Sequence, residues 1–159
     1  MGTRSLTHII EDKKTLTTIY RQYDGYLAGH GNDLAEFLKD FKVVNGYSGD
    51  TTKLANGMGC LTAQLIAHFK KECGNIYIYP PNTKDCWEEY DYTIYLEDNK
   101  IKIKVASVYG LKGKADTLFD GTPEKFLGLP EQEKKPLPLF NRVFNHLKQL
   151  LTTKIIKNA

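Results

Sequence analysis

Residues 100–108 (KIKIKVASV) begin with strict alternation between lysine and apolar side chains. Successive side chains of a β-strand point to opposite faces of a sheet, so this pattern predicts a strand with one buried face and one face in water. Residues 90–97 form a second β-rich run, and Asp98 and Asn99 between the two runs suit a tight turn. The chain therefore contains an antiparallel hairpin, and the rest of the fold must cover one face of its sheet.

Further β-rich segments accompany this hairpin. The first two are separated by Asp12, Lys13 and Lys14 and suit an opening hairpin, whereas the third stops at a pair of prolines. The fourth is short enough to be an edge strand. In chain order these segments are residues 5–11, 15–23, 75–79 and 117–119. Which face of the opening hairpin is buried stays open at this point, because both faces carry apolar side chains.

Two segments have the apolar spacing of amphipathic helices. The first begins at Asn32, with Gly31 or Asn32 as its N-cap, and its apolar residues recur three and four positions apart. These residues are Leu34, Phe37, Leu38 and Phe41. The second helix has Lys70 and Lys71 in its last turn, and we expect Gly74 to close it as the C′ residue. Its apolar residues are Leu61, Leu65, Ile66 and Phe69.

Two more helices are predicted after the hairpin. Thr122 followed by Pro123 is typical of an N-cap and the first position of a helix, which here ends near Gly128. Residues 130–138 read as a charged, proline-containing surface linker. A C-terminal helix follows over about residues 139–154, with a continuous apolar stripe.

The order of these elements separates strands from helices along the chain. Such an order favours an α+β fold with two layers, a mainly antiparallel sheet and helices packed on one face. With 159 residues, of which 41% are hydrophobic, the chain has enough apolar material for one core. We therefore expect a single domain that covers residues 1–159.

Composition narrows the class of partner. The 22 basic and 19 acidic residues leave a net charge of +3, which is far from the concentrated basic stripe of a nucleic-acid binder but leaves anionic small molecules open. Cys60, Cys73 and Cys86 lack the paired spacing of a zinc site or a disulfide framework. No apolar run is long enough to span a membrane. We expect a cytoplasmic protein without metal, cofactor or membrane partner.

Residues 24–31, here called the glycine loop, are the main candidate for a binding site. Three glycines allow close approach of the backbone to a ligand, and the start of the helix at Asn32 would direct free amide groups at an anion such as phosphate. The predicted ligand-binding residues are Arg4, Arg21, Tyr23, Asp24, Gly25, Tyr26, Gly29, His30, Gly31, Asn32 and Lys53. Neither of the common phosphate-loop fingerprints, GxGxxG and GxxxxGK[ST], is present.

The alternative is structural: Asp24 and Gly25 form a turn, the other glycines let the chain bend, and His30 is exposed. A second glycine-rich connection over residues 46–59 is unusually long. It could fold over the glycine loop as a lid, or it could be a solvated loop.

Several short stretches resemble a family of small, uncharacterised proteins from bacteria and their phages. These stretches are the opening MGTRSLT, the run YRQYDGY followed by GHG and LAEFL, and the later LFDGTPEKFL. The family has Pro-Ser where this chain has Leu27 and Ala28, so we expect a less rigid loop here. The resemblance implies a cytoplasmic protein and suggests a mobile element as its source, but it brings no reaction and no catalytic residue.

We expect from the sequence that the protein binds a phosphorylated small molecule, in the first instance a nucleotide or a nucleotide-derived signal, without turning it over. In a phage, such binding would sequester a host immune messenger. One alternative is a hydrolase or phosphodiesterase in which His30 is the general base and Asp24 orients it. Another is a protein-interaction module that uses the tyrosine-rich sheet and the C-terminal helix, with a homo-oligomer as one form.

Overall fold

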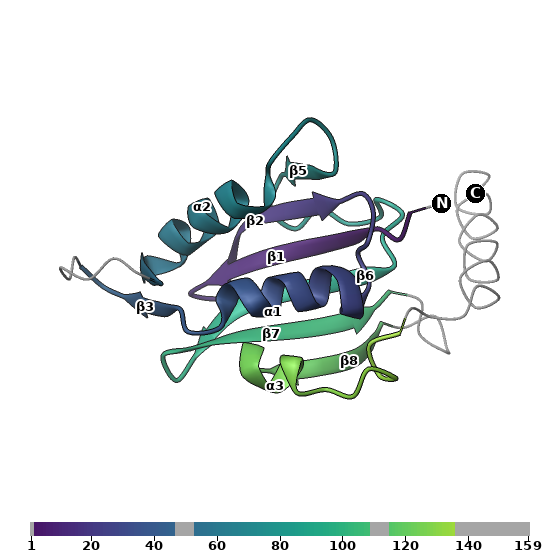
Figure 1. The fold of residues 1–159 in the computed structure, drawn as a ribbon. Helices are drawn as coiled ribbons and strands as arrows, with labels where there is room; N and C mark the ends of the chain where they lie inside the picture. The colour runs from purple at the N-terminus through teal and green to yellow at the C-terminus, as the bar shows by residue number, and fades with distance from the viewer. Residues whose placement is uncertain (1, 47–52, 109–114, 136–159) are drawn as a thin grey trace.

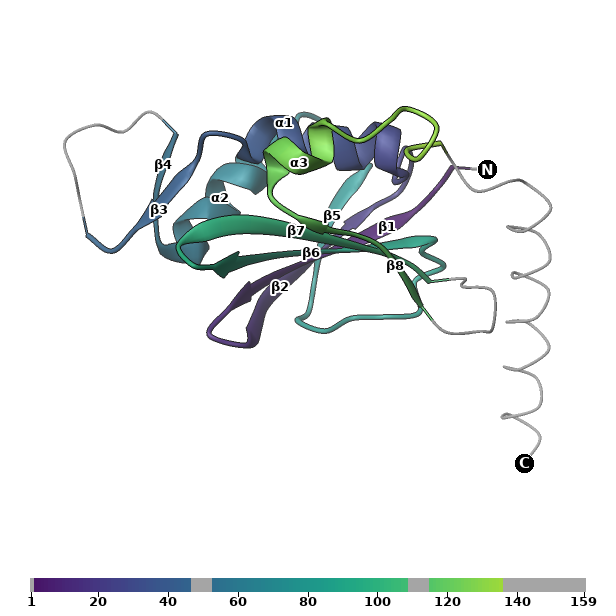
Figure 2. The same ribbon diagram turned by 90° about the horizontal axis from the view of Figure 1, so that it is seen from below.

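The protein has an α+β fold, in which helices cover one face of a six-stranded sheet (Figures 1 and 2). The computed structural model describes residues 2–46, 53–108 and 115–135. The order of the strands across the sheet is β5-β2-β1-β6-β7-β8. Their bounds are Ser5–Glu11 for β1, Lys14–Arg21 for β2, Ile76–Tyr79 for β5, Tyr90–Glu97 for β6, Lys100–Ser107 for β7 and Asp116–Gly121 for β8. The predicted fold class is confirmed.

The sheet is mainly antiparallel and contains one parallel pair. Strands β1 and β2 form the opening hairpin, and β6, β7 and β8 form an antiparallel meander. The two halves join where β1 runs parallel to β6, with Thr7 beside Tyr92. The residues of both hairpin turns, including Asp98 and Asn99, have positive φ, as a tight turn between twisted strands requires.

The buried face of β7 is the predicted one, because Ile101, Ile103 and Val105 lie in the core. The structure also settles the opening hairpin: Ile9 and Ile19 lie in the core cluster with them. Leu6 lies on the opposite face of the sheet and is nevertheless fully buried. Figure 2 shows the connection between β5 and β6 passing along that opposite face.

The first α-helix begins at Asn32, as predicted, but a π-helical turn precedes it and it ends before Phe41. A π-helical turn, η1 (Leu27–Gly31), runs directly into α1 (Asn32–Leu38). Gly31 is the N-cap of α1 and itself has helical dihedral angles. Because η1 covers residues 27–31, most of the glycine loop is helical. The chain leaves the helix at Lys39, and Asp40 has a φ of 68°, which places Phe41 outside α1.

The second helix, α2 (Gly57–Phe69), starts four residues before Leu61, the first residue of the predicted apolar pattern. Gly57 takes a φ of 78°, and the carboxylate of Glu11 accepts a 2.9 Å hydrogen bond from the amide of Met58. The end of β1 thus stabilises the first turn of α2. The helix closes at Lys70, so Gly74 lies in the following turn and is not its C′ residue.

The connections differ most from the sequence prediction. Residues 46–59 include β4 (Leu54–Asn56), which pairs in parallel with β3 (Lys42–Val44), and the first turn of α2. The short helix α3 (Pro123–Leu127) is confirmed, with the Thr122 hydroxyl accepting from the amide of Lys125.

The segment predicted as a surface linker is only partly exposed to solvent. Within residues 130–135, Lys134 is buried, and its ammonium group donates to the carbonyl oxygen of Leu127 over 3.1 Å. The end of this linker and the predicted C-terminal helix lie outside the described residues. In the part of the chain that the structure describes, no helix is both long and apolar enough to cross a membrane.

Candidate functional site

The backbone of the glycine loop is occupied by contacts within the protein. Five of its amides donate to carbonyl oxygens of the chain over 2.8–3.3 Å, and the donors are Gly25, Ala28, Gly29, His30 and Gly31. Asp24 and Tyr26 accept from within the loop, and Thr3 and Lys134 accept from outside it. Contrary to the sequence expectation, the loop does not direct this set of amides at a ligand.

Two of the loop glycines are explained by packing. A Cβ atom on Gly25 would lie 2.8 Å from backbone atoms of Arg4 and Ser5. A Cβ atom on Gly31 would lie 2.5 Å from Cζ of the fully buried Phe126. Both distances are too short for any side chain, so these positions require glycine because neighbouring elements approach the loop closely.

His30 is buried, with 1% of its surface exposed, and both ring nitrogens have partners. Nη1 of Arg21 lies 2.8 Å from Nδ1, and the hydroxyl of Thr7 lies 2.8 Å from Nε2. Burial and the neighbouring guanidinium hold the pKa of His30 well below its ordinary value. The expectation of an exposed histidine is wrong, and the ring has no open nitrogen with which to take a proton from a substrate.

Asp24 is not the carboxylate that belongs to this cluster. Its side chain is exposed, and its carbonyl oxygen accepts from the amide of His30. The carboxylate of Asp33 instead bonds Nη1 of Arg21 over 2.9 Å, and Nε of Arg21 donates to the carbonyl oxygen of Tyr23. The geometry therefore does not favour the hydrolase hypothesis in which Asp24 orients His30.

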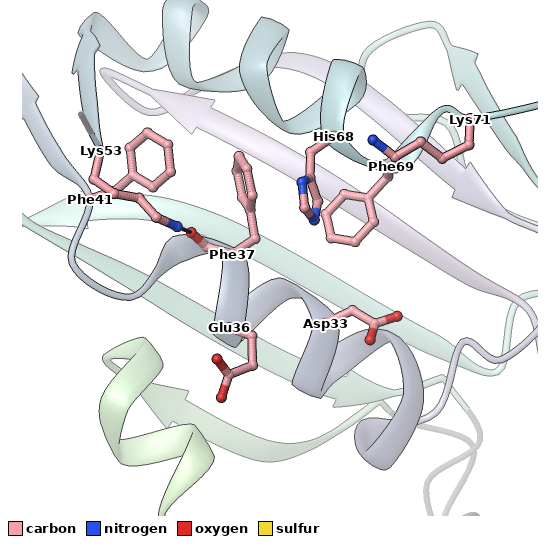
Figure 3. Close-up of a pocket in the computed structure, with 8 residues that line it drawn as sticks. All are labelled: Asp33, Glu36, Phe37, Phe41, Lys53, His68, Phe69 and Lys71. Atoms are coloured by element: carbon pink, nitrogen blue, oxygen red, sulfur yellow. Dashed lines mark hydrogen bonds between the residues drawn. The ribbon is translucent and has the colours of Figure 1, made fainter. Parts of the chain in front are cut away.

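A pocket of about 640 Å³ lies beside this cluster, between α1 and α2 (Figure 3). It is lined by Asp33, Glu36, Phe37, Phe41, Lys53, His68, Phe69 and Lys71. Four of these side chains form a row of rings across the pocket, which we call the ring row: Phe41, Phe37, His68 and Phe69. Figure 3 shows Lys53 near one end of the row, Lys71 near the other, and the two carboxylates along α1.

The ring row is held by contacts between its own members. The ring centroids of Phe37 and Phe41 are 5.0 Å apart, and those of Phe37 and His68 are 4.6 Å apart with planes inclined by 31°. Phe69 meets His68 edge to face at 4.8 Å. Partial burial, followed by the charges of Lys71 and Lys53, lowers the pKa of His68. The imidazole is therefore neutral at pH 7 and can stack as an uncharged ring.

The charged side chains around the pocket differ in whether they form ion pairs. Arg21 neutralises Asp33, and Lys39 pairs with Glu36 on the surface of α1. Nζ of Lys53 donates to the carbonyl oxygen of Phe37 over 2.7 Å and lies 4.8 Å from the ring centroid of Phe41. Within the described residues no ion pair joins Lys53 or Lys71 to a carboxylate. The two lysines therefore give the pocket a positive character.

The predicted ligand residues are divided between the pocket and the glycine loop. Lys53 lines the pocket, and Arg21 reaches it through Asp33. Tyr23 is exposed, while Arg4 and Tyr26 are partly buried; the side-chain amide of Asn32 donates to the carbonyl oxygen of Ala28. Their role in ligand binding, with that of Gly29, stays a prediction that the hydrogen bonding of the loop does not favour.

Sequence reasoning missed the ring row. The periodicity places Phe37 and Phe41 in the apolar stripe of the first helix, and Phe69 in that of the second. The available signal was the presence of aromatic rings at the ends of two neighbouring helical patterns. That signal is weak, because aromatic residues at helical spacing normally fill a core.

Comparison of the chain with known proteins does not identify the site, so the site is interpreted from its own geometry. No family model, no curated protein and no solved structure matches the chain. Among residues 2–46, 53–108 and 115–135, no group of three or more histidine, cysteine, aspartate or glutamate side chains could hold a metal ion.

Proposed function

We propose that this protein binds a planar, anionic small molecule of the nucleotide class in the pocket between α1 and α2. The observation that carries the proposal is the combination of the ring row with Lys53 and Lys71, whereas the carboxylates of the pocket are already paired. Stacking surface and uncompensated positive charge within one cavity suit a ligand that has both a flat ring and a phosphate.

The ring row supplies the stacking surface. Base–aromatic stacking contributes about 1–3 kcal/mol per base and tolerates any base, because every base has a π-face. The rings of Phe37 and His68 already contact each other, with centroids 4.6 Å apart and planes inclined by 31°, so a planar ligand packs against the row and not between these two rings. A purely aliphatic ligand would gain burial here but would not use this geometry.

The lysines supply the phosphate contacts. An ammonium group has three donors, and within the described residues Lys53 uses one of them on the carbonyl oxygen of Phe37, so two can serve a ligand. Lys71 is exposed at the end of α2 and can turn toward the pocket. A phosphate that reached either group would make a charge-assisted hydrogen bond.

The carboxylates accept hydrogen bonds from uncharged donors. Asp33 and Glu36 are half-exposed, and their charge is compensated by Arg21 and Lys39. They can accept from ribose hydroxyls or from an exocyclic amine without strong repulsion of a phosphate elsewhere in the pocket. Binding without turnover fits this set of groups, and sequestration of a nucleotide-derived signal is the role that we propose for it.

Calorimetric titration with AMP, ADP and cyclic AMP tests the proposal. We expect at least one of them to bind the wild-type protein and to be recovered intact after the protein is denatured. Lys71→Ala should raise Kd by about tenfold, the usual cost of losing one charge-assisted contact. Phe37→Leu, which keeps most of the volume but removes the ring, should raise it similarly.

Lys84→Ala is the matched control, because Lys84 is an exposed lysine in the connection that passes along the opposite face of the sheet. The same loss of charge at that position should leave Kd unchanged. The proposal is wrong if no nucleotide binds, or if Lys71→Ala and Lys84→Ala weaken binding equally. Recovery of a chemically altered nucleotide would show that the protein catalyses a reaction, and would contradict the proposal of binding without turnover.

A further inference from the structure

A continuous line of side-chain contacts connects the centre of the sheet with the wall of the pocket. It starts at Thr7 on β1, passes through His30 in η1 and Arg21 at the end of β2, and ends at Asp33 on α1. The successive distances are 2.8 Å, 2.8 Å and 2.9 Å. Asp33 alone among the four lines the pocket.

The chemistry of arginine fixes the state of the histidine. A guanidinium is always protonated and can only donate, so Nδ1 of His30 must accept from Nη1 of Arg21. The ring proton then sits on Nε2 and is donated to the hydroxyl of Thr7. His30 is therefore a neutral imidazole in a single tautomer, because a proton on Nδ1 would point at a cation 2.8 Å away.

The surroundings hold the imidazole in place. The ring of Tyr92 meets it edge to face at 5.0 Å, and that of Phe69 does so at 5.9 Å. Phe69 itself belongs to the ring row. The guanidinium of Arg21 is fixed from a second side by the bond from Nε to the carbonyl oxygen of Tyr23. Neither His30 nor Arg21 can turn without leaving a buried polar group unpaired.

We propose that His30 is a positioning residue of the pocket: it holds Arg21, and through Arg21 fixes the carboxylate of Asp33 as an acceptor for a hydroxyl or amino group of the ligand. This inference rests on the proposed function and adds a basis for specificity. A fixed acceptor discriminates strongly against a ligand that lacks the donor, whereas a freely moving carboxylate on the surface of a helix can stay in water.

The test compares AMP with two analogues, one that lacks the 2′ and 3′ hydroxyls and one that lacks the 6-amino group. Wild-type protein should bind one analogue about tenfold more weakly than AMP, and Asp33→Ala should abolish that difference. His30→Leu, which leaves Asp33 in place, should reduce the difference to the level of Asp33→Ala. His30→Gln should retain most of it, since an amide can accept from Arg21 and donate to Thr7.

Thr7→Val provides a second route, because it removes the acceptor of the imidazole proton with little change of volume. It should reduce the discrimination in part, whether or not His30→Leu folds. The NMR signals of the Arg21 guanidinium supply a readout independent of ligand. Slowly exchanging Nη1 protons should be resolved in the wild type and in His30→Gln, should exchange faster in Thr7→Val and should be lost in a folded His30→Leu.

The outcomes separate the two proposals. If AMP binds and the folded His30→Leu and Thr7→Val proteins discriminate as the wild type does, the positioning role is wrong and the proposed function stands. If the wild type binds AMP and both analogues with equal affinity, the positioning role is likewise wrong and the proposed function stands. If the wild type binds no nucleotide, both proposals are overturned.

Discussion

The hydroxyl of Tyr92 donates a 3.0 Å hydrogen bond to the carbonyl oxygen of Gly25. The two residues are 67 positions apart, and the bond joins the middle of β6 to the start of the glycine loop. Tyr92 is completely buried, and burial raises the pKa of its phenol well above the ordinary value. The loop is therefore attached to the centre of the sheet.

Tyr92→Phe should lower the free energy of unfolding by about 1–3 kcal/mol, because it leaves a buried carbonyl oxygen without this donor. Urea denaturation measures the change. Tyr95→Phe is the control: its hydroxyl donates to Asp120 in an exposed bond, and its loss should cost less than about 1 kcal/mol. Equal losses in the two variants would contradict the structural role of Tyr92.

Gly31→Ala should destabilise the protein by about 1–3 kcal/mol, because the new methyl group would overlap the ring of Phe126. Gly59→Ala should have the opposite effect. Gly59 lies in the first turn of α2, no atom of the described residues would lie within 4 Å of a Cβ added there, and alanine favours the helix by about 0.5–1 kcal/mol. Thermal or urea unfolding of the two variants gives the sign of each change in the free energy of unfolding. An unchanged stability of Gly31→Ala would be inconsistent with the close packing of α3 on the loop.

The stability of the protein should fall as the pH drops below about 6.5, the ordinary pKa of histidine. The folded protein lowers the pKa of His30, so below this pH the unfolded chain binds a proton that the folded chain does not. The contribution of His30 is thus fully present above about pH 6.5 and is lost toward its lower folded pKa, with a slope of up to about 1.4 kcal/mol per pH unit.

Urea denaturation between about pH 7.5 and pH 5 measures this slope. His30→Gln should reduce it, because glutamine does not titrate. His68→Gln is the comparison: the pKa of His68 is also lowered, but its side chain is exposed, so its replacement should change the slope less. A slope that is unaffected by His30→Gln would assign the pH dependence to other groups.

Lys134→Ala should loosen residues 130–135 from the body of the protein. The buried ammonium group donates to Leu127, and the backbone carbonyl of Lys134 accepts from the amide of Ala28. We expect a loss of about 1–3 kcal/mol and faster limited proteolysis of this segment. Lys135→Ala should leave both measurements within error, since Lys135 is the exposed neighbour of the same charge.

Much of the fold could be predicted because it depends on contacts between near neighbours in the chain. The alternation that begins at Lys100 identified β7 and its buried face, and Asp98 with Asn99 identified the turn before it. Thr122 and Pro123 marked the start of α3 in the same way. Turn geometry, capping and side-chain alternation each act over a few residues, so the local sequence contains the information.

The candidate site could not be predicted in this way. The composition of the glycine loop matches an open strand-to-helix connection, whereas the carbonyl groups that accept its amides include those of Thr3 and Lys134 from distant segments. The ring row combines residues of α1 and α2 with Phe41, which follows α1, and the sequence pattern does not give the relative position of these segments. A pattern can show that Phe37 and Phe69 are apolar, but not that they meet at a cavity.

The sequence by itself determined the α+β class, most of the strands and the need for cover on one face of the sheet. Tertiary structure alone decided that His30 is buried between Thr7 and Arg21, and that Asp33 rather than Asp24 is the carboxylate of its cluster. The reason is the range of the interactions: strands and turns follow from torsion and side-chain alternation, whereas a buried polar cluster exists only after segments far apart in the chain have packed and excluded water.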